Sequence, residues 1–306
     1  MDRTGEAGQG APAVSVVIVN WNARDVLVDC LRSLAHHPPS VPWEAVVVDN
    51  ASSDGSTAAV RDSAPWARLI ENGENVGLAA ANNQGMAATA GETILISNPD
   101  VVYRAGAVDA LVDLLRRRSR AAFACARLLH PDGTIQTCAG DLPRLGDALL
   151  GRQVARWRSR TEATDGFWWD GWDHDEERPI GHGGEACYLV RRAALAEIGP
   201  QDQRYRLDWE GFDWAARAWA GGWEVWFCPA AEVVHKGGVS IRQAPARWIA
   251  QSHRGMYRYF ADRSPAWARP LIATAFTARA AAKLAAAATG APLHELALRG
   301  RRLNRA

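Results

Sequence analysis

The stretch Val14-Ser15-Val16-Val17-Ile18-Val19-Asn20 is a run of mostly β-branched residues that ends on an amide side chain. A run of this kind, without polar alternation, is typical of a strand that is buried on both faces of a sheet. Residues 44–48 have the same character and end at Asp49-Asn50. Between the two runs, apolar residues recur at helical spacing until Pro38-Pro39. This strand–helix–strand order predicts an α/β fold with a mostly parallel sheet and right-handed crossovers.

The same pattern continues along the chain. A short strand is expected at residues 67–70, a helix at 78–90, and a strand that ends at Ser97. In an open α/β sheet, the carboxyl ends of parallel strands meet at one crevice, where ligands bind. The polar residues that follow the strands are therefore expected to line this crevice: Asn20, Asp49, Asn50, and the triplet Asn98-Pro99-Asp100.

Beyond residue 125 the regular alternation stops. The turn sequence His130-Pro131-Asp132-Gly133 predicts a hairpin over residues 128–137. Residues 141–178 are rich in Trp, Arg and Asp without a clear period, which indicates an irregular insertion. The other expected elements are a helix at 105–118, strands at 122–125, 184–190, 225–228 and 233–235, a helix at 212–220, and helices over 244–288 that are interrupted at Pro265 and Pro270.

Composition and charge restrict the class of protein. The 306 residues are 48% hydrophobic, which is enough for a full globular core, and the net charge is +1. Residues 242–306 carry 12 Lys and Arg against two acids, whereas residues 1–241 carry 23 against 32. The five cysteines lack a C-x-x-C spacing, which favours reduced, buried thiols in a cytoplasmic protein. No nucleic-acid partner is expected.

Two segments bear on membrane targeting. The first dozen residues lack the basic and apolar pattern of a signal peptide. Residues 271–293 are Ala-rich but include Arg279 and Lys283, so we expect a helix that does not span a membrane. The basic tail suits either peripheral contact with anionic lipid or a helical lid or dimer contact with solvated arginines. Its arginines among apolar residues are Arg247, Arg254, Arg258 and Arg269.

Two polar loops follow buried strands. Residues 49–56 hold Asp, Asn and Ser side chains that either contact a nucleobase edge or cap the next helix. Residues 72–77, together with Asn82, form a second polar cluster, in which Gly77 lets the backbone approach a ligand. Taken alone, each loop is explained equally well by turn and capping chemistry.

Taken together and in order, four motifs closely resemble those of the inverting family two glycosyltransferases. The similarity is to the bacterial rhamnosyltransferase-like subgroup, which often has Asn-Pro-Asp where relatives have Asp-x-Asp. The motifs are residues 14–22, 48–56, 71–83 and 97–100. The resemblance implies a GT-A fold with four parts: a flexible N-terminus at 1–13, a nucleotide-sugar-binding half at 14–127, an acceptor-binding half at 128–241, and a helical basic extension at 242–306.

The resemblance also assigns a donor site and a metal site. A divalent cation, Mg or Mn, would bridge the donor diphosphate and be held by Asp100 and His235, with Lys236 and the amides of Gly237 and Gly238 near the phosphates. The donor-binding residues implied are Asn20, Asn22, Asp49, Asn50, Gly77, Asn82, Asn98 and Asp100.

The catalytic base is expected near residues 207–217. Aligning Asp213 and Arg217 with the family pattern puts Glu210 at the family's Glu, and Gly211 where its Asp normally stands. Glu210 is the first choice for the base and Asp208 the second, because either could turn toward the crevice from a helix start. Asp213, one turn further on, is expected to pair with Arg217 at i+4 in a structural role. The alternative for all three acids is that they only cap the helix.

Aromatic residues crowd the second half, where flat rings either stack on sugar faces or fill the core. The acceptor-binding candidates are Trp168, Trp169, Trp172 and Trp209, whereas Trp223 and Trp226 are expected in the core.

The resemblance therefore implies an inverting glycosyltransferase, and the similarity to the subgroup favours rhamnose or a similar hexose as the sugar that it moves. The donor would be a dTDP- or UDP-linked sugar, and the acceptor a hydroxyl on a glycan, a lipid-linked glycan or a small natural product in cell-wall or polysaccharide synthesis. The loss of the Asp at Gly211 keeps a nonenzymatic sugar-binding or scaffold protein as an alternative. A nucleotidyltransferase is a weaker alternative, because Asn20-Trp21-Asn22-Ala23 replaces the Gly-rich basic loop that such enzymes need. The oligomeric state is left open.

Overall fold

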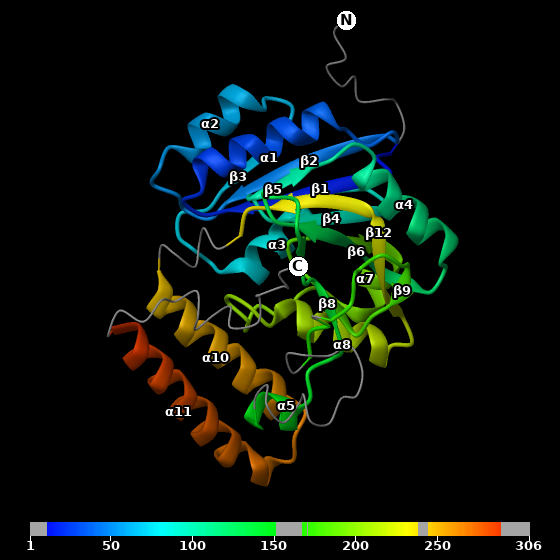
Figure 1. Cartoon of the computed structure of the whole chain (residues 1–306). Coiled ribbons are helices and arrows are strands. Elements are labelled where there is room, and N and C mark those ends of the chain that lie inside the picture. Colours follow the sequence, from blue (N-terminus) through cyan, green and yellow to red (C-terminus); the bar gives the residue numbers. More distant parts are fainter. Residues whose placement is uncertain (1–10, 151–166, 170, 238–243, 289–306) are drawn as a thin grey trace, which may run out of the picture.

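A computed structural model describes residues 11–150, 167–169, 171–237 and 244–288 (Figure 1). Over these ranges, helices cover both faces of a ten-stranded sheet. The strands are β1 (Val14–Asn20), β2 (Trp43–Asp49), β3 (Arg68–Glu71), β4 (Thr93–Ser97), β5 (Val101–Tyr103), β6 (Ala121–Leu129), β7 (Ile135–Gln136), β8 (Ala139–Gly140), β9 (Arg178–Pro179), β10 (His182–Gly183), β11 (Cys187–Arg191) and β12 (Glu224–His235). The main path of the sheet runs β3-β2-β1-β4-β11-β6-β12-β5, and β10 and β8 form a separate pair.

The helices lie in two layers around this sheet and in a pair beyond it. They are α1 (Arg24–His36), α2 (Ser56–Ser63), α3 (Leu78–Ala87), α4 (Ala107–Arg117), α5 (Leu145–Leu150), α7 (Arg192–Ile198), α8 (Glu210–Ala220), α10 (Pro245–Asp262), the short 3-10 helix η1 (Ala266–Ala268) and α11 (Arg269–Ala288). Helices α1 and α2 cover one face of the sheet and α3 the other (Figure 1). Close packing of α3 on β1 depends on Gly85, where a Cβ would stand 2.3 Å from a methyl carbon of Val17.

The first half confirms the predicted α/β alternation. Strands β1, β2, β3 and β4 are parallel, and Asn20 pairs with Asp49 at the carboxyl ends of β1 and β2. The helix that was expected to reach residue 90 ends at Ala87 instead. The reason is that the Gly91 N–H donates to the Ser15 hydroxyl at 2.8 Å, which turns the chain into β4.

The second half departs from pure alternation and brings new strands to the same edge. Strand β11 is antiparallel to β4, with Cys187 opposite Ser97, so the segment before β11 lies beside the end of β4. The predicted hairpin is confirmed as β6 and β7. Two separate strands were expected at 225–228 and 233–235, but β12 is one strand with a register shift after Cys228. Pro229 lies in this shift, because proline has no N–H to donate to the ladder.

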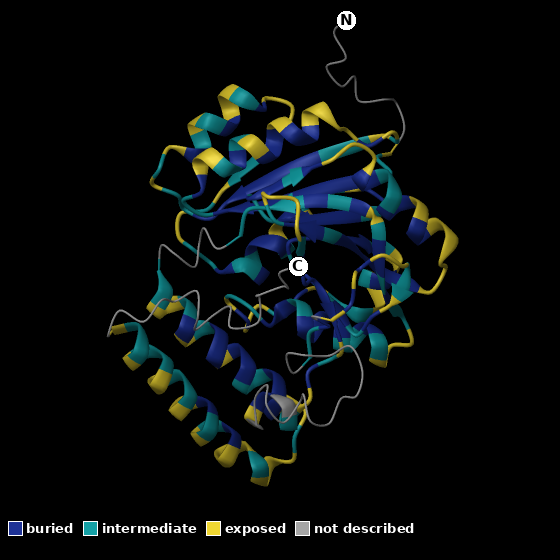
Figure 2. Ribbon diagram, in the orientation of Figure 1, coloured by how far each residue is buried: buried dark blue, intermediate teal, exposed yellow. Residues whose placement is uncertain are grey.

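The core lies in the sheet and on the inner faces of its helices, as the dark blue segments of Figure 2 show. All five cysteine side chains are buried, as the sequence predicts. Trp223 and Trp226, expected in the core, are half-buried and pack against its edge. The irregular insertion predicted at 141–178 contains α5 and lies between the paired strands β8 and β10, while its residues 151–166 and 170 lie outside the described residues.

The C-terminal extension folds as the pair α10 and α11, which pack on each other beyond the sheet (Figure 1). An interruption was expected at Pro270, but this residue stands in the first turn of α11, where its missing N–H needs no partner. Within the described residues, the helical stretch Ala266–Ala288 has the length and composition of a membrane span. That it does not cross a membrane therefore stays a prediction.

Candidate active site

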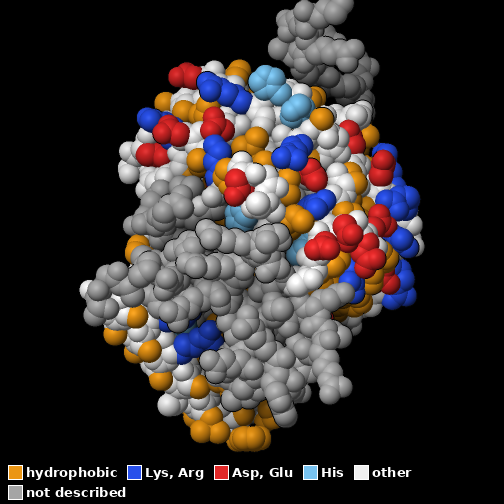
Figure 3. All heavy atoms as spheres, viewed as in Figure 1, with side chains coloured by type: hydrophobic (Ala, Val, Ile, Leu, Met, Phe, Trp, Pro, Cys, Tyr) orange, Lys and Arg blue, Asp and Glu red, His pale blue; other side chains and the backbone are white. Residues whose placement is uncertain are grey.

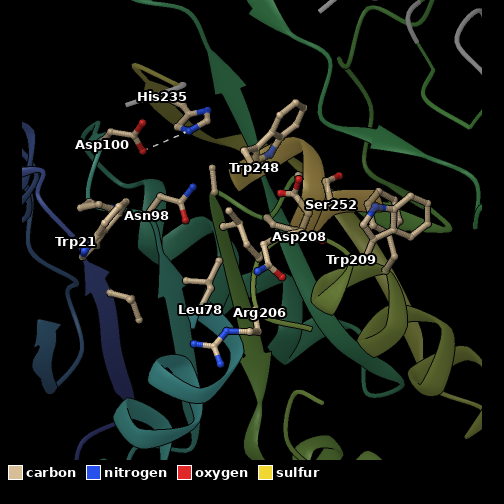
Figure 4. A pocket seen from close by; sticks show the side chains of 18 of the residues that line it. Trp21, Leu78, Asn98, Asp100, Arg206, Asp208, Trp209, His235, Trp248 and Ser252 are labelled. Atoms are coloured by element: carbon tan, nitrogen blue, oxygen red, sulfur yellow. Dashed lines mark ion pairs between the residues drawn. The ribbon is translucent and has the colours of Figure 1, made fainter. Parts of the chain in front are cut away.

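A cleft of about 460 Å³ opens at the edge of the sheet where β1, β2 and β4 end. Its lining combines the strand ends, the segment before β11, residues 206–209 and helix α10. Trp21, Asn98 and Asp100 stand on one side, and Asp208 and Trp248 stand across from them (Figure 4). Both halves of the predicted domain and the C-terminal extension therefore contribute to one site.

Asp100 and His235 form the polar end of this cleft. Asp100 Oδ1 lies 3.3 Å from His235 Nε2, and the dashed line in Figure 4 joins them. The other ring nitrogen of His235, Nδ1, is 2.6 Å from Gln136 Oε1, which orients the ring. Asp100 is only 6% exposed. Burial raises the pKa of its carboxyl, but hydrogen bonds from His235 and backbone N–H groups outweigh it, so the pKa lies below the ordinary value.

Asn50 organises the loops at the nucleotide side of the cleft. Its Oδ1 accepts hydrogen bonds from the Val76 N–H at 3.0 Å and from Asn72 Nδ2 at 3.2 Å. The chain can turn into α3 here because Gly77 adopts a φ of +96°, which is open to glycine. A Cβ on Gly77 would also lie 3.1 Å from the Arg206 carbonyl oxygen. The loop at 72–77 and the segment that bears Arg206 are thus held together.

The predicted donor-binding residues divide into two groups. Asn50, Asn98 and Asp100 line the cleft. The others lie behind it and brace the loops: Asn20 donates to Asp49 Oδ1 at 2.9 Å, Asn22 Oδ1 accepts from the Ser53 N–H at 2.7 Å, and Asn82 donates to Gln201 Oε1 at 3.0 Å. Among the described residues, Asn20, Asn22, Asp49, Gly77 and Asn82 are absent from the lining.

The tryptophans proposed for the acceptor also divide. Trp168 and Trp209 line the cleft. Trp169 and Trp172 instead belong to the main core, where the Arg178 guanidinium stacks over both rings. Trp209 packs on Tyr259 and Phe260 of α10, which fixes this helix as a wall of the cleft.

The acids near the start of α8 occupy different depths. Asp208 lines the cleft, and the side chains of Trp248 and Ser252 lie beside it (Figure 4). Glu210, the expected base, is only 2% exposed and does not contribute to the described lining. Burial raises the pKa of the Glu210 carboxyl well above its ordinary value, and the neighbouring charge of Glu185 raises it further.

Sequence reasoning missed Glu185, which lines the cleft next to these acids. Burial, and then the charge of Asp208, raise the pKa of the Glu185 carboxyl to about 8, although Glu210 and the backbone N–H groups of Gly211 and Phe212 oppose the rise. Two arginines that line the cleft were also not among the predicted site residues. Arg206 reaches it from the loop before α8, and Arg247 of α10 lies over the ring of Trp21 at 5.3 Å.

Residues 15–167 match the model of the family described as Glycosyl transferase family 2. Over 239 residues, the chain is 31% identical to the N-acetylglucosaminyl-diphospho-decaprenol L-rhamnosyltransferase of Mycobacterium tuberculosis. The aligned region covers 74% of this chain and 78% of that protein.

The fold is similar to those of two solved structures, each with a TM-score of 0.56. One is the mannosyltransferase PcManGT from Pyrobaculum calidifontis with GDP-Man and Mn²⁺, at 19% identity over 95% of this chain and 80% of that one. The other is GalNAc-T7 with UDP, GalNAc and Mn²⁺, at 17% identity over 74% of this chain and 44% of that one.

Proposed function

The chain belongs to glycosyl transferase family 2 and has the GT-A fold, and from this premise we propose that it transfers rhamnose or a similar hexose to a lipid-linked glycan with inversion. It is a glycosyltransferase that uses a nucleotide-sugar donor. The observation that carries the finer proposal is the cleft itself. It joins a carboxylate–imidazole pair at the strand ends to an aromatic wall on the opposite side.

The donor would occupy the side of the cleft formed by the strand ends. Asn50 and Asn98 offer amide groups for the nucleoside, and Trp21 offers a flat ring. Arg206 and Arg247 place positive charge in the same cleft, which favours a diphosphate. These residues come from segments far apart in the chain, so the donor would also hold α10 against the sheet.

Asp100 and His235 fit a divalent cation that is shared with the donor. One carboxylate and one imidazole are suitable ligands for Mn²⁺, while Mg²⁺ prefers oxygen ligands and commonly takes one or two carboxylates together with substrate phosphates. Among the described residues, no group of three or more His, Cys, Asp or Glu side chains could hold a metal alone. This agrees with a cation completed by diphosphate oxygens. When bound, it would neutralise charge on the departing nucleoside diphosphate.

The acceptor would enter from the side of α10. Trp168, Trp209 and Met256 give this side an apolar surface, while Asp208 and Glu185 supply carboxylates beside it. An inverting transfer needs a base on this side, because the acceptor oxygen attacks the face of the sugar opposite the leaving group. The mycobacterial relative, by its name, acts on a diphospho-decaprenol-linked sugar, which supports a lipid-linked acceptor here.

Peripheral contact with a membrane belongs to the same proposal. Trp267 is 75% exposed and Leu271 67% exposed, at the junction of η1 and α11. Figure 3 shows hydrophobic side chains on the lower edge of the molecule, where Figure 1 places this junction. Arg269 lies between these two residues in the sequence and could contact anionic headgroups.

We expect the protein to sediment with vesicles of phosphatidylglycerol, and a Trp267→Ser, Leu271→Ser protein to remain largely in the supernatant. Salt should weaken the wild-type binding, because part of the attraction is electrostatic. Equal sedimentation of the two proteins at every salt concentration would rule out this edge as the contact.

The transfer reaction is tested by a panel of donors with Mn²⁺ or Mg²⁺: dTDP-rhamnose, UDP-glucose, UDP-N-acetylglucosamine and GDP-mannose. The expected result is release of nucleoside diphosphate from dTDP-rhamnose or a UDP-sugar, slow with water as acceptor and lost with EDTA. Tight donor binding without any release, even with a diphospho-polyprenol-linked N-acetylglucosamine added, would point to the scaffold alternative.

A further inference from the structure

We propose that Glu185 is the catalytic base of the transfer, and that its carboxyl group takes the space which a side chain at position 211 would otherwise fill. This assignment rests on the proposed function. It names a residue outside the acidic stretch at 208–213 to which the sequence pattern points.

The topology brings Glu185 to the donor. Glu185 lies two residues before β11, which runs antiparallel to β4, so it stands at the edge of the sheet where β4 ends. The Asn98 N–H donates to the Ala186 carbonyl oxygen at 2.8 Å. The segment that bears Glu185 is therefore joined directly to the Asn98-Pro99-Asp100 triplet. Glu185 lines the cleft together with Asn98 and Asp100.

The space around Gly211 shows why a carboxylate can come from this segment. A Cβ built on Gly211 would stand 2.3 Å from Glu185 Oε1 and 2.6 Å from its carboxyl carbon. No side chain fits at 211 while Glu185 keeps this position. In the register that aligns Asp213 and Arg217 with the family, position 211 is the place of an aspartate. The chain thus lacks a carboxylate at position 211 of α8 and supplies one from the connection before β11 to the same point.

The neighbouring acids are less suited to accept a proton from a sugar hydroxyl. Glu210 is buried and does not line the cleft, so its carboxyl is not placed to meet the acceptor. Burial raises the pKa of the Asp208 carboxyl above its ordinary value, although Ser252 and Trp248 of α10, which lie beside it, favour its charged form. The Oε1 atom of Glu185 is buried and accepts no well-formed hydrogen bond from the part of the chain that the structure describes.

The protonation states of Glu185 and of the titratable groups around it also favour Glu185 as the base. The groups that face it are Asp208 and Glu210 at the start of α8, Tyr188 of β11 and Cys125 of β6. Burial raises the pKa values of Tyr188 and Cys125, which remain neutral. The pKa of Glu210 is also well raised, so Glu210 keeps its proton while Glu185 ionises at about pH 8. A base with a pKa near the working pH is efficient.

The proposed step is balanced in atoms and charge. The acceptor oxygen forms a bond to the anomeric carbon while its proton passes to a carboxylate oxygen of Glu185. The bond between the anomeric carbon and the diphosphate oxygen breaks, and its electron pair leaves with the nucleoside diphosphate. The proton on Glu185 is then released to solvent through the cleft.

The first test is Glu185→Gln, measured on the donor that gives the most nucleoside diphosphate with wild-type protein. Turnover should fall by about 100- to 10,000-fold, the usual contribution of a general base, while donor binding is kept. The wild-type rate should rise with pH up to about 8, because only the ionised carboxyl accepts a proton, and this limb should vanish in the variant. Glu197→Gln, on the helix that follows β11 and outside the cleft, is the matched control.

A second pair of variants moves the carboxylate back to α8. Glu185→Gly with Gly211→Asp has room for the new side chain, and Glu185→Gly with Gly211→Asn has the same shape without the charge. The double variant with the aspartate should be at least about tenfold more active than the one with the asparagine. This comparison of the two double variants also tests whether a carboxylate at this point is the base if Glu185→Gln fails to fold.

The outcomes separate the two levels of the proposal. A wild-type protein without turnover on any donor overturns the proposed function and this assignment with it. An active wild-type protein beside an equally active Glu185→Gln overturns this assignment alone. Equal activities of the two folded double variants do the same, as does a Glu210→Gln protein that loses more turnover than Glu185→Gln.

Discussion

Asp100→Asn is expected to leave the fold intact and to lower metal-dependent turnover by at least about 100-fold. The change removes the negative charge that Asp100 brings to the pair with His235, but keeps the size of the side chain. An amide is a much weaker ligand for a divalent cation than a carboxylate. The measurement is nucleoside diphosphate release against Mn²⁺ concentration, in which the variant should require far more metal to reach half of its maximal rate.

A matched control separates this effect from a general loss of charge. Asp113→Asn changes an exposed carboxylate on α4 that lies 3.8 Å from the Arg116 guanidinium and does not line the cleft. This protein should keep the wild-type metal dependence, and both variants should melt close to the wild-type temperature. An Asp100→Asn protein with full activity at low Mn²⁺ would remove Asp100 from the metal site.

The nucleotide half of the fold could be predicted because its signals are local. Strands β1, β2 and β4 are largely apolar and buried, and polar residues follow them at once, so Asn50, Asn98 and Asp100 reach the cleft as expected. Sequence order does not tell which polar residue faces a ligand and which braces a loop. Asn20 and Asp49 use their side chains to bind each other, a contact between residues 29 positions apart.

The residues on the acceptor side were harder to predict, because their roles depend on the face to which each side chain points and on contacts between residues far apart in the sequence. Trp168 forms an antiparallel bridge with Gly140, and successive side chains of an extended segment point to opposite faces. Trp168 therefore joins the cleft while Trp169 enters the core. Glu185 could not be found from the sequence, because its significance lies in the space beside Gly211, which is distant from it along the chain.

Asp213→Ala is expected to have the largest effect on stability, lowering the free energy of unfolding by about 2–3 kcal/mol. The sequence predicted the i+4 pair, and the structure confirms it: Arg217 Nε lies 2.9 Å from Asp213 Oδ2. The other carboxylate oxygen, Oδ1, accepts a hydrogen bond at 2.8 Å from Arg263, the residue that follows α10. Asp213 is buried, so removing it leaves two guanidinium groups with less compensation for their lost hydration.

The control for Asp213→Ala is Asp262→Ala at the end of α10. Asp262 pairs with Arg204, but both side chains are more than a third exposed, so its removal should cost less than about 1 kcal/mol. Urea unfolding of both proteins gives the comparison. Because Asp213 ties α8 to α10, and α10 forms a wall of the cleft, Asp213→Ala should also weaken donor binding while Asp262→Ala should not. Equal stabilities of the two variants would show that α10 is held by its aromatic contacts with Trp209 alone.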